Sequence, residues 1–178
     1  MSKDGLASFV FQPINETFVR NQLTTLKSNK AIGLDRISGR LLKDASEILT
    51  TSFTLIFNRS LQIGIFPNIW KMGKVTALFK SGSNTETNNY RHITVLPTIS
   101  KIIEKAVHGQ IYTFLANRNI LTSKQFGFRE KLSATTALTH FKDNILKNMV
   151  NGQIRGAAFL DLSRAFDTVD HNLILSKL

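Results

Sequence analysis

Asp161 is the residue of this sequence best placed to carry out chemistry. It follows a short apolar run, residues 154–160, which predicts a buried strand. A carboxylate at the end of a core strand costs several kcal/mol unless it is paired or binds a metal ion. Two more acids, Asp167 and Asp170, follow closely, so three of the twelve acidic residues fall in the last eighteen positions. This stretch is the first candidate for a functional site.

Several roles suit Asp161, and its neighbours leave them open. In a phosphatase or a phospho-receiver such an aspartate is the nucleophile. In a polymerase it binds Mg²⁺, which clamps a triphosphate. A purely structural role is also open, because Asp161 can cap the next helix or pair with Arg164. Against the phosphotransfer role, Ser163 stands where a second catalytic acid is usual.

Composition limits the classes of protein that the sequence can represent. The 178 residues suit one domain, or a domain and part of a second, and a 42% hydrophobic content suffices for a core. The absence of cysteine excludes disulfides and thiolate metal sites. No apolar run approaches the ~20 residues that span a bilayer, and residues 1–13 lack a signal-peptide pattern. We therefore expect an intracellular protein without membrane partners, in the nucleus or the cytoplasm.

The charge is strongly positive and unevenly distributed. The net charge is +11, and residues 71–131 hold ten lysines and arginines against three acids. A basic field of this size favours a polyanionic partner, nucleic acid first. The alternative is a solvated surface that serves only solubility.

Hydrophobic periodicity predicts a mostly helical chain with one hairpin. Helices are expected over residues 15–29, 38–49 and 53–63, from Thr98 or Ser100 to Arg118, over 133–151, and again near the end of the chain. Strands at 75–79 and 90–96 flank a polar loop and predict a hairpin. Lys74, Lys80 and Arg91 lie at its mouth, where they can grip phosphates or simply face solvent.

An irregular stretch, residues 121–129, places two aromatic residues around a glycine. Phe126 and Phe128 flank Gly127, and Arg129 follows. Such a loop can approach a nucleotide closely, with stacking worth ~1–3 kcal/mol per base. It can equally be a loop that its aromatic side chains anchor in the core.

Six motifs, taken together and in order, resemble the reverse transcriptase domain of non-LTR (LINE-type) retrotransposons, and the jockey group most closely. The resemblance covers residues 23–178. The motifs are Gly33-x-Asp35-x-Ile37, Phe66-Pro67-x-x-Trp70-Lys71, Val75-x-x-Leu78-Phe79-Lys80, Asn89-Tyr90-Arg91-x-Ile93-x-x-Leu96, Gln125-Phe126-Gly127-Phe128-Arg129, and the stretch from Phe159 to His171. Three positions depart from the family pattern, namely Ile32, Arg36 and His92.

The resemblance implies an α+β, right-hand polymerase fold in a truncated form. Helical fingers with a basic β-hairpin would lead into the first strand and helix of the palm. The corresponding division is a lead-in over residues 1–22, fingers and fingers/palm helices over 23–150, and the start of the palm over 151–178.

The resemblance also implies roles for particular residues. Asp161 matches the catalytic ligand of Mg²⁺ (or Mn²⁺), and the backbone from Leu162 would lie against the incoming dNTP. Phe166 matches the aromatic residue beneath the sugar, and Lys80 and Arg91 fall where the fingers approach the triphosphate. The residues matching the template-binding stretch are Gln125, Phe126, Gly127 and Arg129.

The implied function is that of a nucleotidyltransferase fragment. Two-metal catalysis needs carboxylates from a second place, an aromatic-x-Asp-Asp hairpin in this family, and these residues contain no adjacent Asp pair. We therefore expect an RNA-directed DNA polymerase in full length, acting on an RNA template, a DNA primer and dNTPs, and no activity of this fragment alone. The alternative is a non-catalytic nucleic-acid-binding module derived from a retroelement. The oligomeric state is left open.

Overall fold

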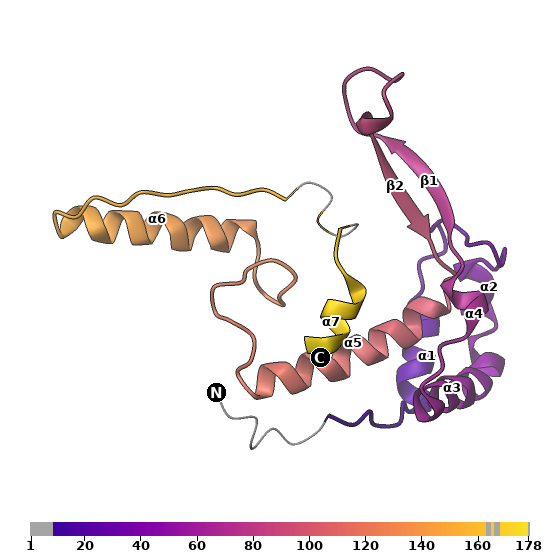
Figure 1. The fold of residues 1–178 in the computed structure, drawn as a ribbon. Coiled ribbons are helices and arrows are strands. Elements are labelled where there is room, and N and C mark those ends of the chain that lie inside the picture. Colours follow the sequence, from indigo (N-terminus) through magenta and orange to yellow (C-terminus); the bar gives the residue numbers. More distant parts are fainter. Residues whose placement is uncertain (1–8, 163–164, 166–167, 178) are drawn as a thin grey trace. The chain divides into compact units, whose positions relative to one another are not determined.

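A computed structural model of the chain describes residues 9–162, 165 and 168–177 (Figure 1). The chain divides into two compact units, Met1–Leu121 and Thr122–Leu178. Each unit is described by itself.

In its described part, residues 9–121, unit 1 is built on five helices around one apolar core. These are α1 (Glu16–Thr24), α2 (Gly39–Asp44), α3 (Ser46–Ile63), α4 (Asn68–Lys71) and α5 (Ser100–Asn117). Helix α1 lies against α3, with α2 and α5 beside it. The buried apolar side chains are Ile14, Val19, Leu23, Leu42, Phe57, Trp70, Ile99, Ile102, Ile103 and Ala106. Parts of the predicted apolar stripes therefore meet in this unit, while Leu41, Ile48 and Ile56 of those stripes are exposed.

Local chemistry explains where the helices of unit 1 begin and end. The side chain of Asn15 accepts a hydrogen bond from the Phe18 amide at 2.8 Å, which caps α1. Helix α1 ends at Thr24, earlier than expected, where the hydroxyl of Thr25 donates to the Asn21 carbonyl at 2.6 Å. Gly64 ends α3 at a φ of +67°, as predicted.

The helix predicted over residues 38–49 is interrupted at Ala45. Its backbone turns to φ −92° and ψ 10°, so α2 ends there and α3 begins at Ser46. The interruption follows no glycine or proline, which is why the apolar period alone did not predict it. It places Leu42 of α2 and Phe57 of α3 in the same core.

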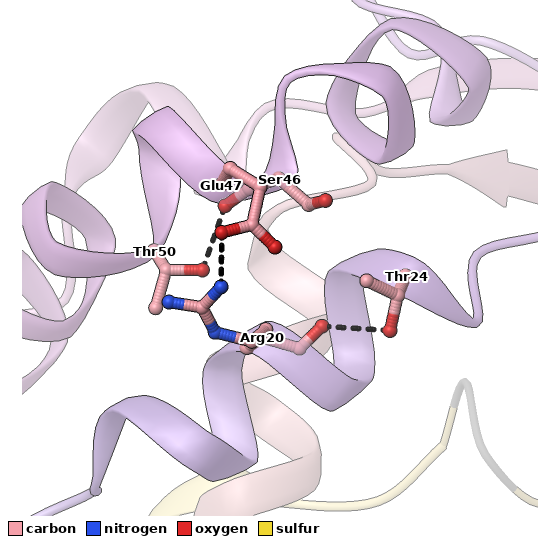
Figure 2. A network of polar contacts seen from close by, with 5 residues as sticks. All are labelled: Arg20, Thr24, Ser46, Glu47 and Thr50. Carbon is pink, nitrogen blue, oxygen red and sulfur yellow. Dashed lines mark hydrogen bonds and ion pairs between the residues drawn. The ribbon is translucent and has the colours of Figure 1, made fainter.

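A polar layer joins α1 to α3 beside the core (Figure 2). Arg20 forms an ion pair with Glu47, and Glu47 raises the pKa of Arg20 by a hydrogen bond and by its charge. Thr50 is fully buried, and its hydroxyl donates to the Ser46 carbonyl at 2.7 Å. Helix α3 can bury Thr50 because its hydroxyl finds an acceptor within the same helix.

The hairpin of unit 1 has the predicted strands, β1 (Lys74–Phe79) and β2 (Tyr90–Val95). They pair antiparallel, from Lys74 opposite Val95 to Phe79 opposite Tyr90. The connecting loop contains a short 3₁₀ turn, η1 (Thr87–Asn89), and the Tyr90 hydroxyl donates to the Asn84 carbonyl at 2.8 Å. The hairpin is thus an ordered element, and both of its faces are largely exposed.

The base of the hairpin lies against a glycine from the loop before α2. A Cβ atom on Gly33 would come within 2.9 Å of the Pro97 nitrogen and 3.0 Å of its Cα. These are backbone atoms, which cannot move aside as the end of a long side chain can. The glycine of the first sequence motif therefore lets the 30–37 loop meet the end of β2.

The described residues of unit 2 form two helices, α6 (Ala134–Val150) and α7 (His171–Lys177). Ser133 starts α6 with a capping box, in which its hydroxyl accepts from the Thr136 amide. An extended segment, residues 153–162, runs back along α6 (Figure 1).

The prediction of a buried strand at residues 154–160 is wrong for this structure. Residues 153–162 form no strand and are exposed, with Ile154 and Leu160 at 102% and 95% of full side-chain exposure. A strand exists only through hydrogen bonds to a neighbour, and β1 and β2 of the described residues pair with each other. The apolar run has the composition of a core strand without a sheet to join.

Candidate functional site

Asp161 lies on the exposed extended segment of unit 2. It is followed by Leu162, which is 77% exposed. Asp161 caps none of the described helices, so the structural alternative of a helix cap does not apply to it among these residues. The carboxylate is open to solvent, and a ligand can reach it.

Asp170 has a structural role, because its side chain caps the N-terminus of α7. Its Oδ1 atom accepts hydrogen bonds from the amides of Asn172 at 2.8 Å and Leu173 at 3.2 Å. This is the geometry of a helix N-cap. Within the part of the chain that the structure describes, no three His, Asp or Glu side chains gather as a group able to hold a metal ion. Phe166 and Asp167 lie outside the described residues.

Lys80 and Arg91 lie on the same face of the hairpin. Arg91 is opposite Leu78 in the strand register. The Lys80 amide donates to the Asn89 carbonyl at 2.7 Å, which continues the pairing by one residue beyond β1. Side chains alternate along a strand, so Lys80 projects on the Leu78 face, diagonal to Arg91 at ~7–8 Å. Lys74 lies on this face too, four positions before Leu78.

The opposite face of the hairpin is aromatic rather than basic. Phe79 lies opposite Tyr90, with ring centroids 5.4 Å apart, and His92 lies opposite Ala77. The register thus separates the cations from the aromatic rings. The sequence prediction that Lys74, Lys80 and Arg91 all lie at the mouth of the hairpin is wrong in part. The three share one face, but Lys74 is at the base, opposite Val95, whereas Lys80 and Arg91 are at the loop end.

The stretch that matched template-binding residues folds as a loop held by its own side chains. Gln125 donates from Nε2 to the Gly127 carbonyl at 3.2 Å, and Arg129 donates from Nη1 to the Thr122 carbonyl at 3.3 Å. Phe128 has a φ of +58° and is 87% exposed. Phe126 instead turns toward α6, with its ring centroid 5.5 Å from that of His140. The loop therefore presents Phe128 and holds Phe126 inward.

Sequence reasoning missed the residues of α6 that surround Phe126. A cavity of about 560 Å³ in unit 2 is lined by Phe126, by His140 and Asn144 of α6, and by the cations Lys124 and Arg155. The Asn144 amide nitrogen lies 3.0 Å from His140 Nδ1. His140 and Asn144 are four positions apart and share a helix face, a spacing that was visible in the sequence. Only the fold brought Phe126 and Arg155 to that face.

The class of protein follows from comparison with known families. Residues 79–178, more than half of the chain, match the family described as reverse transcriptase (RNA-dependent DNA polymerase). The chain belongs to this family. The match begins at the last residue of β1 and includes β2, the 122–132 loop and Asp161.

Relatives of the chain include polymerases of mobile elements from Drosophila. The chain is 31% identical over 160 residues to the RNA-directed DNA polymerase from mobile element jockey of Drosophila melanogaster, which covers 89% of this chain and 18% of that protein. It is 27% identical over 166 residues to the jockey polymerase of Drosophila funebris, covering 93% of this chain and 18% of that protein. The predicted resemblance to the jockey group is confirmed.

A third relative extends the likeness to another element. The chain is 28% identical over 172 residues to the "Probable RNA-directed DNA polymerase from transposon BS" of Drosophila melanogaster, covering 96% of this chain and 19% of that protein. The chain thus spans less than a fifth of the length of these relatives. Among the described residues, no helix is both long and apolar enough to cross a membrane.

Proposed function

We propose that this chain supplies the fingers and the beginning of the palm of an RNA-directed DNA polymerase from a non-LTR retrotransposon. The complete enzyme would add dNTPs to a DNA primer 3′-hydroxyl along an RNA template. The observation that carries the proposal is the family match over residues 79–178, which spans β2 and Asp161. In the proposed right-hand fold, residues 1–22 lead in, 23–150 form the fingers and fingers/palm helices, and 151–178 begin the palm.

The basic face of the hairpin is proposed to bind the triphosphate of the incoming nucleotide. Lys80 and Arg91 are diagonal neighbours on that face and are exposed. Arg offers a two-pronged fork to phosphate oxygens, and Lys adds a point charge. Residues of the 122–132 loop, namely Gln125, Phe126, Gly127 and Arg129, are proposed to lie along the template strand.

The extended segment is proposed to be the first palm strand. Its apolar side chains are exposed, as expected for a core strand that lacks its neighbours. In the complete polymerase, strands from the remaining four-fifths of the protein would cover it. Asp161 would then lie at a sheet edge, with Leu162 and Phe166 close to the nucleotide.

The magnesium ions that this chemistry uses would neutralise charge on the transferring phosphoryl group. The described residues do not fit a complete site for them. Asp161 offers a single exposed carboxylate, and Oδ1 of Asp170 already accepts two backbone amides. The 178 residues contain no adjacent Asp pair. We therefore assign Asp161 as one metal ligand.

The proposal is tested on the reading frame and on the protein that it encodes. If the frame continues past the Leu178 codon into an aromatic-x-Asp-Asp hairpin, the longer protein is expected to extend a primer on an RNA template. Asp161→Asn should then reduce extension by at least ~10³-fold, because a metal ion stabilises the transition state by several kcal/mol. Asp143→Asn, an exposed acid on α6, is the control. Full activity of the Asp161→Asn protein would contradict the assignment.

The second candidate function is a nucleic-acid-binding module without catalysis. The net charge of +11 and the exposed cations of the hairpin favour it. The 178-residue chain should then bind RNA or DNA in a salt-dependent manner, and Asp161→Asn should leave this binding unchanged. Template-directed incorporation of dNTPs by this chain alone would exclude the module. For either function we propose an intracellular location, in the nucleus or the cytoplasm, where RNA and DNA are found.

A further inference from the structure

The extended segment of unit 2 has an unpaired backbone. Residues 154–162 are exposed, and no hydrogen bond joins their backbone to another described residue. The side chain of Phe159 contacts Phe141 of α6, with ring centroids 5.8 Å apart. The amides and carbonyls of such a segment form a ready template for a neighbouring strand.

The charges of this segment are complementary to those of a second copy of the chain. If two copies run antiparallel with Ala158 opposite Ala158, Arg155 of each copy lies opposite Asp161 of the other. Neither of these side chains has an ion-pair partner among the described residues of its own chain. The pair therefore gains two contacts between opposite charges, which stabilise antiparallel strands.

The uncharged side chains fit the same arrangement. Gly156 lies opposite Leu160, and Ala157 lies opposite Phe159, so each large side chain meets a small one. Opposite residues of an antiparallel pair project on the same face and contact each other. Leu160 and Phe159 are 95% and 84% exposed in the single chain, so pairing removes apolar surface from water.

Other pairings of two copies lose these matches. A parallel pair in register places Arg155 beside Arg155 and Asp161 beside Asp161, and like charges in that position destabilise a sheet. An antiparallel pair that is shifted by one residue in its centre sets Arg155 opposite Phe159 and Asp161 opposite Gln153, without either ion pair. The antiparallel register centred on Ala158 is therefore favoured.

Helix α6 supports such a pair in each copy. A two-stranded ribbon by itself is marginal in water, and packing against a helix stabilises it; the contact of Phe159 with Phe141 provides that packing. We propose that two copies of the 178-residue chain associate through residues 154–162, as antiparallel strands centred on Ala158. The inference does not rest on the proposed polymerase function. In the complete polymerase other strands of the same protein would cover this segment, whereas here the second copy takes their place.

The test is the oligomeric state of the 178-residue chain, measured by sedimentation velocity over a range of concentrations. The unaltered chain should form dimers as its concentration rises. Arg155→Asp and Asp161→Arg should each raise the dissociation constant by about tenfold, because two contacts between opposite charges become two between like charges. An equal mixture of the two variants should regain dimers, since each then complements the other. Lys142→Asp, at an exposed cation of α6, makes the same charge change outside the segment and should leave the dimer intact.

A disulfide probe tests the register. The chain contains no cysteine, and opposite Cα atoms of an antiparallel pair lie ~4.5–5.5 Å apart, within the range that a disulfide spans. Ala158→Cys should therefore form a covalent dimer under mild oxidation. Ile154→Cys lies opposite Leu162 and far from its own counterpart, so it should do so roughly tenfold more slowly or less.

The outcomes decide the proposal. A chain that stays monomeric at all concentrations overturns it. Dimers that persist in both charge variants, or a mixture of the variants that does not regain dimers, show that another surface joins the copies and also overturn it. Equal rates of disulfide formation at positions 154 and 158 overturn the register, and this measurement decides where a charge variant does not fold. Primer extension by the longer polymerase is measured separately, so failure of the proposed function would leave this inference standing.

Discussion

Gln12 and Gln110, 98 positions apart in the chain, are joined by two hydrogen bonds. The Gln12 backbone amide donates to the Gln110 side chain, and the Gln110 side chain donates to the Gln12 carbonyl. The side-chain amide of Gln110 offers one donor and one acceptor side by side, so it pairs with the Gln12 backbone as a neighbouring strand would in a sheet. Asn58 does the same for Ile14. These two amides anchor the segment before α1 to α5 and α3.

The first prediction concerns this anchoring. Asn58→Ala should lower the free energy of unfolding by ~1–3 kcal/mol, because the Ile14 amide and carbonyl lose their partners at a buried residue. Urea denaturation followed by circular dichroism measures the change. Gln62→Ala on the same helix, whose side chain accepts a hydrogen bond from the exposed Arg59, is expected to have little effect.

The second prediction concerns the aromatic motif before the hairpin. Trp70 is 8% exposed and contacts Phe57 and Phe66 edge-on, at centroid distances of 5.7 and 5.9 Å. Trp70→Ala should destabilise the fold by ~3–5 kcal/mol, because a large buried ring leaves a cavity. Thermal unfolding tests this. Ile69→Ala, one residue earlier and 59% exposed, should cost little, and equal losses for both would contradict the packing.

The third prediction compares two glycines. Gly33→Ala places a methyl group against the Pro97 backbone and should cost ~1–3 kcal/mol, the usual cost of overpacking. Gly109→Ala meets open space and should stabilise α5 by up to ~1 kcal/mol. Chemical denaturation of the two variants should therefore give opposite signs. A destabilised Gly109→Ala protein would show that other side chains pack against α5 at this position.

The fourth prediction concerns the two cations of the basic face. Lys80→Gln and Arg91→Gln should each weaken binding of a single strand and reduce the salt slope by ~0.7, because each removes one phosphate contact. Arg40→Gln is the control, since Arg40 already faces Asp44 at 3.7 Å on α2. Filter binding at several salt concentrations gives the slopes. If all three variants behave alike, binding follows total charge and not this face.

Much of unit 1 could be predicted from local sequence. Asn15, Ser38 and Gly64 act as the caps and the stop that their residue types indicate, because capping depends on neighbours within one turn. The hairpin was predicted from two short strands around a polar loop, and the shared face of Lys80 and Arg91 followed once the register was known. The family was predicted from motifs and is confirmed.

Tertiary structure alone decided the rest. The enclosure of Gly33 by Pro97 and the meeting of Gln12 with Gln110 join residues distant in sequence, and no local period encodes them. The break at Ala45 follows no residue type that marks the end of a helix. The apolar run before Asp161 shows the opposite case, because its sequence predicted a strand that the structure does not form. Its sequence has strand composition, but a strand is completed by hydrogen bonds to a partner, and residues 153–162 have none in a described sheet. Sequence thus determined the caps, the periods and the family, while pairing and packing determined which surfaces are covered and which are open.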